Sequence, residues 1–292
     1  MLYDIRLRLH YEYEAAAGGS RHHLHVSPQT IPGVQRVIAS SLSFSPTPTE
    51  RFDFADFFGN AVTSIALRRS YDALDMRMSA RISVSRPEPG LDVSPVLANL
   101  ADEIASIRSL APDAPHHFLA PSDFVGIEPA ITAYARETLS GGASVTSVAH
   151  ELCRRIYRDF TYDGDATTVA TRAADAFALR RGVCQDYSHV MIAGLRGLGI
   201  PAGYVSGFLR TIPPPGKERL EGADAMHAWV RVWCGREAGW QEFDPTNDMR
   251  ASTDHIVVGY GRDYADVAPI VGILKTTGDH TGEQAVDVIP VG

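Results

Sequence analysis

The chain has 292 residues, 45% of them hydrophobic, and its 35 acidic and 27 basic residues give a formal net charge of −8. This length fits about two domains, or one large domain with an extension, and provides a core large enough to preorganise a site. The charges are spread along the chain, whereas phosphate binding needs a clustered basic face, so nucleic acid and anionic membranes are not expected as main partners.

The first residues and the cysteines bear on the compartment. The stretch Met1–Glu14 mixes charged and apolar residues, unlike a signal peptide, and no segment approaches the roughly 20 apolar residues of a membrane helix. The three cysteines, Cys153, Cys184 and Cys234, form no CxxC pair. An odd, sparse set of this kind favours a reducing compartment over a disulfide framework. We therefore expect a cytoplasmic protein.

Residues 1–86 are predicted to form a β-rich N-terminal domain, a small sandwich or barrel. From Tyr3 to Tyr13 apolar residues occupy one parity and mostly charged residues the other, which is the pattern of a half-buried strand. The same alternation returns between Leu74 and Val84. Shorter candidate strands lie between them, at about 22–28, 35–44 and 50–57, and at Ala61–Leu67 after a Phe58-Gly59-Asn60 turn.

The pattern changes after the stretch Ser85–Gly90, whose prolines and glycine mark a linker. Residues 87–140 are predicted to be a helical connecting segment and 141–292 a second domain. Apolar residues at helical spacing predict helices over about 97–110, 131–139 and 144–160. Strands are predicted at Tyr204–Leu209, Met226–Cys234, Trp240–Phe243, about 255–260 and about 285–290. Helices followed by a run of strands indicate an α+β fold.

Cys184 is the first candidate for chemistry. Apolar residues recur at helical spacing after it, until the Gly and Pro residues of Gly197–Pro201, so a helix is predicted to begin near Cys184. Gly182 would allow a tight approach before that helix. A thiol at a helix N-terminus faces unpaired N–H groups and the positive end of the dipole, which favour the thiolate. The alternative is that Cys184 is a small buried hydrophobe.

A base and its partner are predicted on later strands. His189 lies about 140° around the helix from Cys184 and so points elsewhere. His227 shares with Trp229 the non-core face of a strand, which suggests a cleft wall. Asp244 follows the next strand, where a carboxylate could hold the imidazole tautomer as the third member of a triad. Taken singly, His227 could be a packed surface imidazole and Asp244 the start of an Asx turn.

The remaining candidates favour structural roles. Cys153 and Cys234 each lie on the apolar side of their element and are predicted to be core residues. The cluster His22-His23-Leu24-His25 lacks a cysteine or carboxylate at ligand spacing. We therefore predict no metal site and no cofactor.

Several ordered motifs resemble the bacterial transglutaminase-like family, whose members are often described as cysteine proteases. The matching stretches are Gly182–Asp186, Gly199–Ala202 with Tyr204–Gly207, His227–Trp229, Phe243–Asn247, His255–Val258 and Gly261–Val267. Residues 1–85 look like the β-rich N-terminal region of these proteins. Two positions depart from the pattern, Met226 where Ser or Thr is expected and Gly203 where Arg is common. Both changes could alter a substrate groove.

The resemblance implies a papain-like core in residues 141–292 with a triad that maps onto Cys184, His227 and Asp244. It implies a thiol-dependent acyl-transfer enzyme acting on amides through a thioester, first of all a cysteine protease or amidase. The alternatives are a protein-glutamine transamidase and a non-catalytic binding module that keeps the fold. Trp229 and Tyr187 are expected to line the cleft.

Two points stay open from the sequence. Gln185 and Tyr162 are both candidate oxyanion donors, and nothing in the residues chooses between them. A peptide, a protein or a small amide fits as substrate, and a homo-oligomer is one of the open assembly states.

Overall fold

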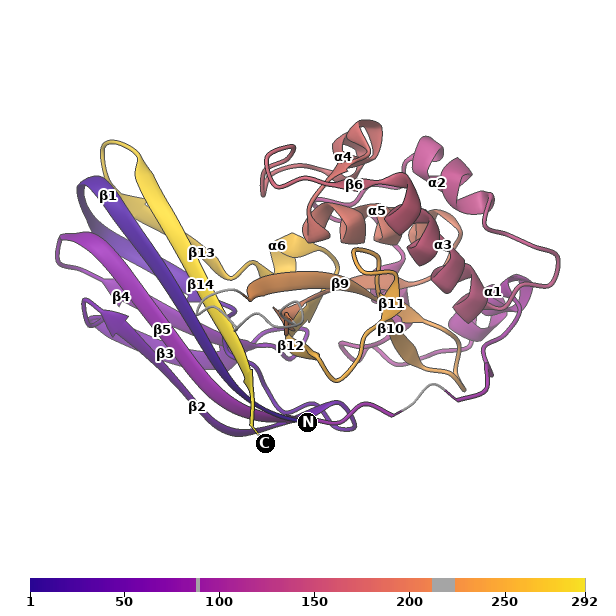
Figure 1. Ribbon diagram of the computed structural model, residues 1–292, viewed down its shortest axis with the longest axis horizontal. Coiled ribbons are helices and arrows are strands. Elements are labelled where there is room, and N and C mark those ends of the chain that lie inside the picture. Colours follow the sequence, from indigo (N-terminus) through magenta and orange to yellow (C-terminus); the bar gives the residue numbers. More distant parts are fainter. Residues whose placement is uncertain (88–89, 212–223, 292) are drawn as a thin grey trace, which may run out of the picture.

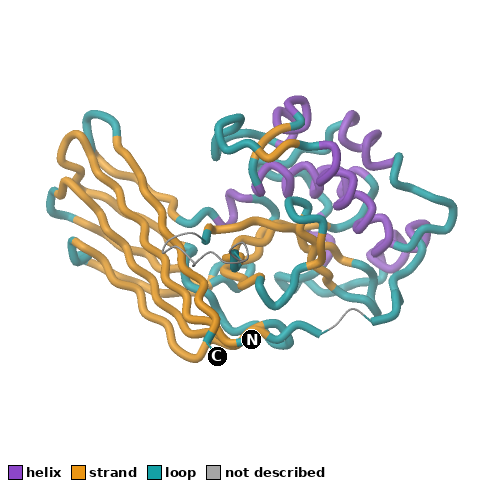
Figure 2. Tube along the Cα trace, in the orientation of Figure 1, coloured by secondary structure: helices purple, strands orange, loops and turns teal. Residues whose placement is uncertain are grey.

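The computed structural model describes residues 1–87, 90–211 and 224–291 (Figure 1). An antiparallel β-sheet forms one end of the molecule, and helices packed on a second antiparallel sheet form the other (Figure 2). This arrangement confirms the predicted α+β fold. Of the helices in these three ranges, none combines the length and apolar character that a membrane span requires.

The elements are as follows. The first part contains β1 (Leu2–Leu24), β2 (Gln35–Ser45), β3 (Glu50–Ala55), β4 (Ala61–Leu67) and β5 (Tyr71–Val84). The helices are α1 (Leu97–Ala105), the 3-10 turn η1 (Pro115–Phe118), α2 (Pro129–Arg136), α3 (Val145–Asp159), α4 (Ala173–Leu179), α5 (Cys184–Gly197) and α6 (Tyr264–Val267). The later strands are β6 (Thr161–Tyr162), β7 (Arg181–Gly182), β8 (Ala202–Leu209), β9 (Ala225–Trp233), β10 (Trp240–Asp244), β11 (Met249–Arg250), β12 (His255–Gly261), β13 (Ile270–Lys275) and β14 (His280–Pro290).

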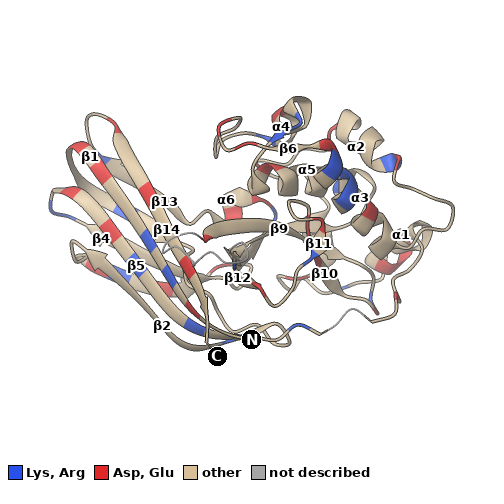
Figure 3. Ribbon diagram, viewed as in Figure 1, with Lys and Arg blue, Asp and Glu red and all other residues tan. Residues whose placement is uncertain are grey.

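Strand β1 organises the N-terminal sheet, whose order is β2-β5-β1-β4-β3. Its first half pairs with β5 and β14, and its second half pairs with β4 and β13. A register shift between Glu12 and Ala17 lets the strand continue through its small residues. The separate strand predicted at 22–28 is therefore wrong: residues 22–24 are the end of β1, and 25–28 lie outside any strand. Charged residues pair on the solvent face, as Arg8 does with Asp75 at 2.6 Å (Figure 3).

The apolar face of this sheet is completed by distant parts of the chain. Side chains such as Ile5, Leu74 and Met76 form one core with Phe208 of β8 and Ile256 and Val258 of β12. Strands β13 and β14, which the predicted division assigned to the range 141–292, add to the sheet from the C-terminal end. The sheet and its cover are therefore built from both ends of the chain.

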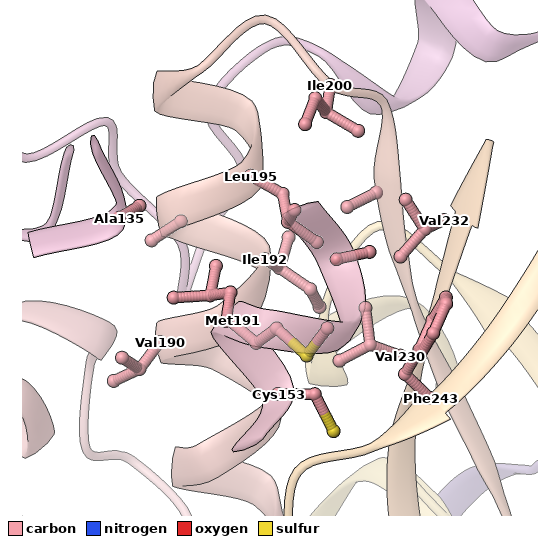
Figure 4. Close-up of a cluster of buried hydrophobic side chains, with 14 of the residues drawn as sticks. Ala135, Cys153, Val190, Met191, Ile192, Leu195, Ile200, Val230, Val232 and Phe243 are labelled. Carbon is pink, nitrogen blue, oxygen red and sulfur yellow. The ribbon is translucent and has the colours of Figure 1, made fainter. Parts of the chain in front are cut away.

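The second sheet has the order β11-β10-β9-β8-β12 and carries α5 on one face. Met191, Ile192 and Leu195 of α5 pack toward Val230 and Val232 of β9 (Figure 4). Helix α5 begins and ends where the sequence predicted. Cys153 and Cys234 are fully buried, which confirms them as core residues.

Side-chain amides from the N-terminal sheet satisfy the free edge of β12. Gln35 donates to the Val257 carbonyl at 2.7 Å and accepts from the Val257 N–H at 2.8 Å. Asn60, in the predicted turn, does the same for Tyr260 at 2.8 and 2.7 Å. Because an edge strand otherwise leaves these backbone groups unpaired, the contacts tie β12 firmly to the first sheet.

Candidate active site

Cys184 is the first residue of α5, directly after the short parallel pair β6 and β7. The Asp186 carboxylate folds back to accept from the Val183 N–H at 2.8 Å and from the Thr167 hydroxyl at 2.7 Å, which fixes the start of the helix. A Cβ at position 182 would lie 2.3 Å from an Asp186 carboxylate oxygen, so Gly182 is needed for this turn. The half-buried thiol therefore sits at the positive end of α5.

The structure brings His227 and Asp244 to this thiol. Nε2 of His227, on β9, lies 2.7 Å from Oδ2 of Asp244 at the end of β10. The Cys184 thiol lies close enough to the same imidazole to raise its pKa, and with Nε2 engaged Nδ1 is the nitrogen left for the sulfur. Asp244 is fully buried, and only 9% of the His227 side chain is exposed. His227 thus lies between a thiol at the start of a helix and a buried carboxylate.

The neighbours of His227 and Asp244 set the charge on these two groups. Burial by itself would lower the pKa of His227, but its hydrogen bonds with Asp244 and Cys184 raise that pKa to about 10. Burial would raise the pKa of Asp244, but donation from His227 and His255 brings it well below its usual range. At neutral pH the carboxylate is ionised and the imidazole holds a proton against the thiol sulfur.

This charge state predicts how stability depends on pH. The folded-state pKa of His227 lies above the value of about 6.5 expected in the unfolded chain. Protonation of His227 therefore contributes stability that is fully present below about pH 6.5 and is lost as the pH rises through about 10. In urea denaturation at pH 6, 8 and 10, the free energy of unfolding should fall more steeply with pH for the wild type than for His227→Gln. Parallel losses in the two proteins would contradict the assignment.

His255 is a member of this site that the sequence did not identify. It is fully buried at the start of β12, and its Nε2 lies 3.1 Å from the same Oδ2 of Asp244 that bonds His227. The sequence noted His255 only as the start of a matching motif. Its proximity depends on β12 pairing with β8 across the sheet, which no local pattern reveals.

His227, Asp244 and His255 also form a cluster compact enough to be tested as a metal site, with ligand atoms within 4.8 Å of one another. Nδ1 of His255, however, accepts from the Ser252 backbone N–H at 3.1 Å, which leaves the ring proton on Nε2. That proton points at Asp244, so Nε2 of His255 has no lone pair to offer a metal in this arrangement. The cluster fits a proton-sharing network better than a set of metal ligands.

The four predicted substrate-side residues have different surroundings. The prediction that Trp229 and Tyr187 line a cleft is wrong, because their side chains are 0% and 2% exposed. Gln185 is also buried, and its amide donates to the Val169 carbonyl at 3.0 Å. Tyr162 is 61% exposed and close enough to Cys184 for the thiolate charge, after burial, to raise its pKa. Tyr162 is thus the candidate that faces both solvent and the thiol.

Trp229 packs against both imidazoles of the site. Its ring stacks near His227, with centroids 6.0 Å apart, and meets His255 edge-on at 5.1 Å. Its indole N–H donates to buried Glu242 at 2.7 Å. Glu242 also accepts from Arg86 of the predicted linker at 2.9 Å. Parity placed Trp229 on the correct face, but that face is covered by Glu242 and Arg86 rather than open to solvent.

The two departures from the family pattern lie in packed surroundings. A side chain at Gly203 would meet the Gly261 carbonyl at 2.8 Å and the ring of Phe118 at 2.9 Å. Met226 packs against the core of the N-terminal sheet. The structure therefore gives both positions a packing role.

Comparisons with known proteins agree with this geometry. The family described as the transglutaminase-like superfamily matches residues 132–245, and the bacterial transglutaminase-like N-terminal region matches residues 3–83. An uncharacterized protein of Mycobacterium tuberculosis is 36% identical over 293 residues, covering 99% of this chain and 92% of the relative. One from Mycobacterium leprae is 30% identical over 281 residues, covering 95% of each.

A solved structure shares the whole fold. A protein from Cytophaga hutchinsonii, provisionally described as a cysteine protease, aligns with a TM-score of 0.75 at 20% identity, covering 99% of this chain and 90% of that chain. The resemblance stated from the motifs is confirmed. This chain belongs to the transglutaminase-like superfamily and carries the bacterial transglutaminase-like N-terminal region.

Proposed function

We propose that the chain is a cysteine hydrolase of amide bonds, a protease or amidase, in which Cys184 is the nucleophile, His227 the general base and acid, and Asp244 the residue that orients His227. The observation that carries the proposal is His227, hydrogen-bonded to Asp244 at 2.7 Å and close to the Cys184 thiol at the N-terminus of α5. An activated nucleophile needs a base within reach and a third group that holds the base, and all three are present.

The reaction begins from the form in which the proton of Cys184 already resides on Nδ1 of His227, a thiolate beside an imidazolium. The thiolate attacks the amide carbonyl carbon, and the electron pair of the C=O bond moves to oxygen. Unpaired N–H groups in the first turn of α5 stabilise this oxyanion. When the C–N bond breaks, the proton on His227 goes to the leaving amine and a thioester on Cys184 remains.

Water completes the cycle. His227, now neutral, takes a proton from water as the oxygen attacks the thioester carbonyl. The tetrahedral intermediate collapses and the C–S bond breaks, which releases the acid and restores the thiolate beside protonated His227. Asp244 stays ionised throughout and keeps Nε2 of His227 protonated, so that Nδ1 is the nitrogen that exchanges protons.

Tyr162 is assigned to the mouth of the site. Its phenol is exposed, and the nearby Cys184 adds to burial in raising its pKa, which supports a position near the path of a substrate carbonyl to the thiolate. The phenol O–H can donate to the oxyanion beside the backbone donors of α5. Gln185, by contrast, has its amide committed to Val169. Exposure on this side also admits water, which favours hydrolysis over transfer to an amine.

The test separates hydrolysis from transamidation and from simple binding. A mixture of glutamine-containing peptides is incubated with the protein, with and without hydroxylamine, and the products are weighed by mass spectrometry. Hydrolysis predicts free acids or cleaved peptides as main products without hydroxylamine, and none with Cys184→Ala. Hydroxamate formed with hydroxylamine, but no acid without it, would favour a transamidase. No product from a broad peptide and amide panel would favour a binding module.

A further inference from the structure

His255 hydrogen-bonds the carboxylate that orients His227, although the proposed reaction does not use His255. Its Nε2 lies 3.1 Å from Oδ2 of Asp244, and the His227 Nε2 lies 2.7 Å from the same oxygen. The two imidazole centroids are 6.2 Å apart, one on either side of the carboxylate. A fully buried imidazole at this place needs a physical account.

The backbone determines which nitrogen of His255 carries the proton. The Ser252 backbone N–H lies 3.1 Å from Nδ1 of His255, and an N–H can only donate. Nδ1 must therefore accept, so the proton of the neutral ring is on Nε2 and points at Asp244. His255 thus stabilises the carboxylate as a neutral donor. A cationic partner in its place would compensate the negative charge that His227 depends on.

Oδ2 of Asp244 is held by three donors. Besides the two imidazoles, the Asn247 side-chain amide donates at 2.7 Å, and the Thr246 backbone N–H donates to the other oxygen, Oδ1, at 2.9 Å. Donors to a buried carboxylate favour its ionised form and limit its rotation. Asn247 and Thr246 come from the turn that follows Asp244 itself. His255 of β12 is, besides His227 of β9, the donor that comes from another strand.

The N-terminal sheet fixes the position of His255. On one side, Tyr3 of β1 donates its phenol proton to Asp254 at 2.6 Å. On the other side, Gln35 of β2 holds both backbone groups of Val257. Trp229 packs edge-on against the imidazole at 5.1 Å. The imidazole is therefore locked in place by residues from both sheets.

We propose that His255 is a positioning residue, a fourth member of the network, which acts through Asp244 to hold its carboxylate ionised and turned toward His227. The proposal rests on the proposed function, because it concerns the same thiol. It also gives the N-terminal sheet a role, since that sheet holds the strand that carries His255.

The test measures how fast iodoacetamide alkylates Cys184 as a function of pH, in the full chain. His255→Phe keeps a ring but removes the donor, whereas His255→Gln places an amide N–H where Nε2 was. Loss of a hydrogen bond to a charged group predicts a fall of roughly 10-fold or more in the alkylation rate at pH 7 for His255→Phe, with an acid limb shifted to higher pH. His255→Gln should recover most of the rate. His22→Gln, at a buried imidazole in the N-terminal sheet, is the matched control and should leave the profile unchanged.

The outcomes are distinguishable. A wild-type thiol that reacts no faster than free cysteine would overturn the proposed function itself. A reactive wild type with an unchanged profile in His255→Phe would overturn the positioning role alone. If His255→Phe does not fold, the wild type still decides, because long-range 15N–1H NMR reports the tautomer of each imidazole. Observing the Nε2–H tautomer of neutral His255 supports the proposal, and the Nδ1–H tautomer overturns it.

Discussion

Replacing Cys184 with alanine is expected to reduce amide hydrolysis to background, a loss of about 10⁶-fold in kcat where a residual rate can be measured. No other thiol can substitute, because Cys153 and Cys234 are fully buried in the core. The fold should survive, since the Cys184 side chain is small and only partly buried at the margin of the core that α5 packs against. The free energy of unfolding should stay within about 1 kcal/mol of wild type.

The control is Cys234→Ala. This thiol contacts the Val232 carbonyl at 3.6 Å inside the core, so its removal should lower stability while leaving turnover intact. Labelling with one equivalent of iodoacetamide, followed by peptide mass mapping, should place the label on Cys184. Turnover that persists in Cys184→Ala, or labelling spread evenly over the three cysteines, would show that the thiol is not the nucleophile.

Local patterns in the sequence were sufficient to place Cys184 and His227, the two proposed catalytic residues nearest the surface. A glycine before Cys184 and a Gly–Pro ending gave the bounds of α5, because helix termini leave backbone groups whose needs are met by nearby residues. The alternation of residues along β9 separated His227 from the apolar side chains of the core face, because this pattern too is read from neighbouring residues. The features that were missed depend on which strands become neighbours, and one sequence does not contain that information directly.

Trp229 and His255 illustrate this limit. Parity gave the correct face for Trp229, but a central strand is covered on both faces, and the cover comes from Glu242 and from Arg86 in the linker. His255 reaches Asp244 only because β12 pairs with β8 and is held at its outer edge by Gln35. The wrong exposure predicted for Trp229 and the missed position of His255 both arise where the N-terminal and C-terminal parts of the chain meet.

The meeting of these two parts also bears on how the site is maintained. Asp244 needs donors from its own turn and from β12, and β12 is the edge strand that the N-terminal sheet completes. A chain without residues 1–85 would expose the backbone edge of β12 and the apolar side chains Ile256 and Val258. The N-terminal region is therefore part of the structure that orients the triad.

Replacing Asp244 with alanine is expected to give the largest combined loss of activity and stability. The substitution leaves the N–H groups of His227, His255 and Asn247 without their shared acceptor in the interior. Each buried donor left unpaired costs about 1–3 kcal/mol, so the free energy of unfolding should fall by roughly 3 kcal/mol or more. Loss of the orienting carboxylate should lower kcat by about 10⁴-fold. Urea denaturation measures the loss of stability, and turnover of a substrate identified with the peptide panel measures the loss of activity.

Asp244→Asn separates the charge from the hydrogen bonds. Its carbonyl can still accept from His227, but its amide meets the other donors and it carries no negative charge, so activity should fall between wild type and Asp244→Ala. Without the charge that helps raise the pKa of His227 to about 10, the alkaline limit of turnover should move toward neutral pH. Asp72→Ala, at an exposed carboxylate of β5, should change stability by less than about 0.5 kcal/mol. If Asp244→Ala kept its activity within tenfold of wild type, His227 would not depend on this carboxylate for its orientation.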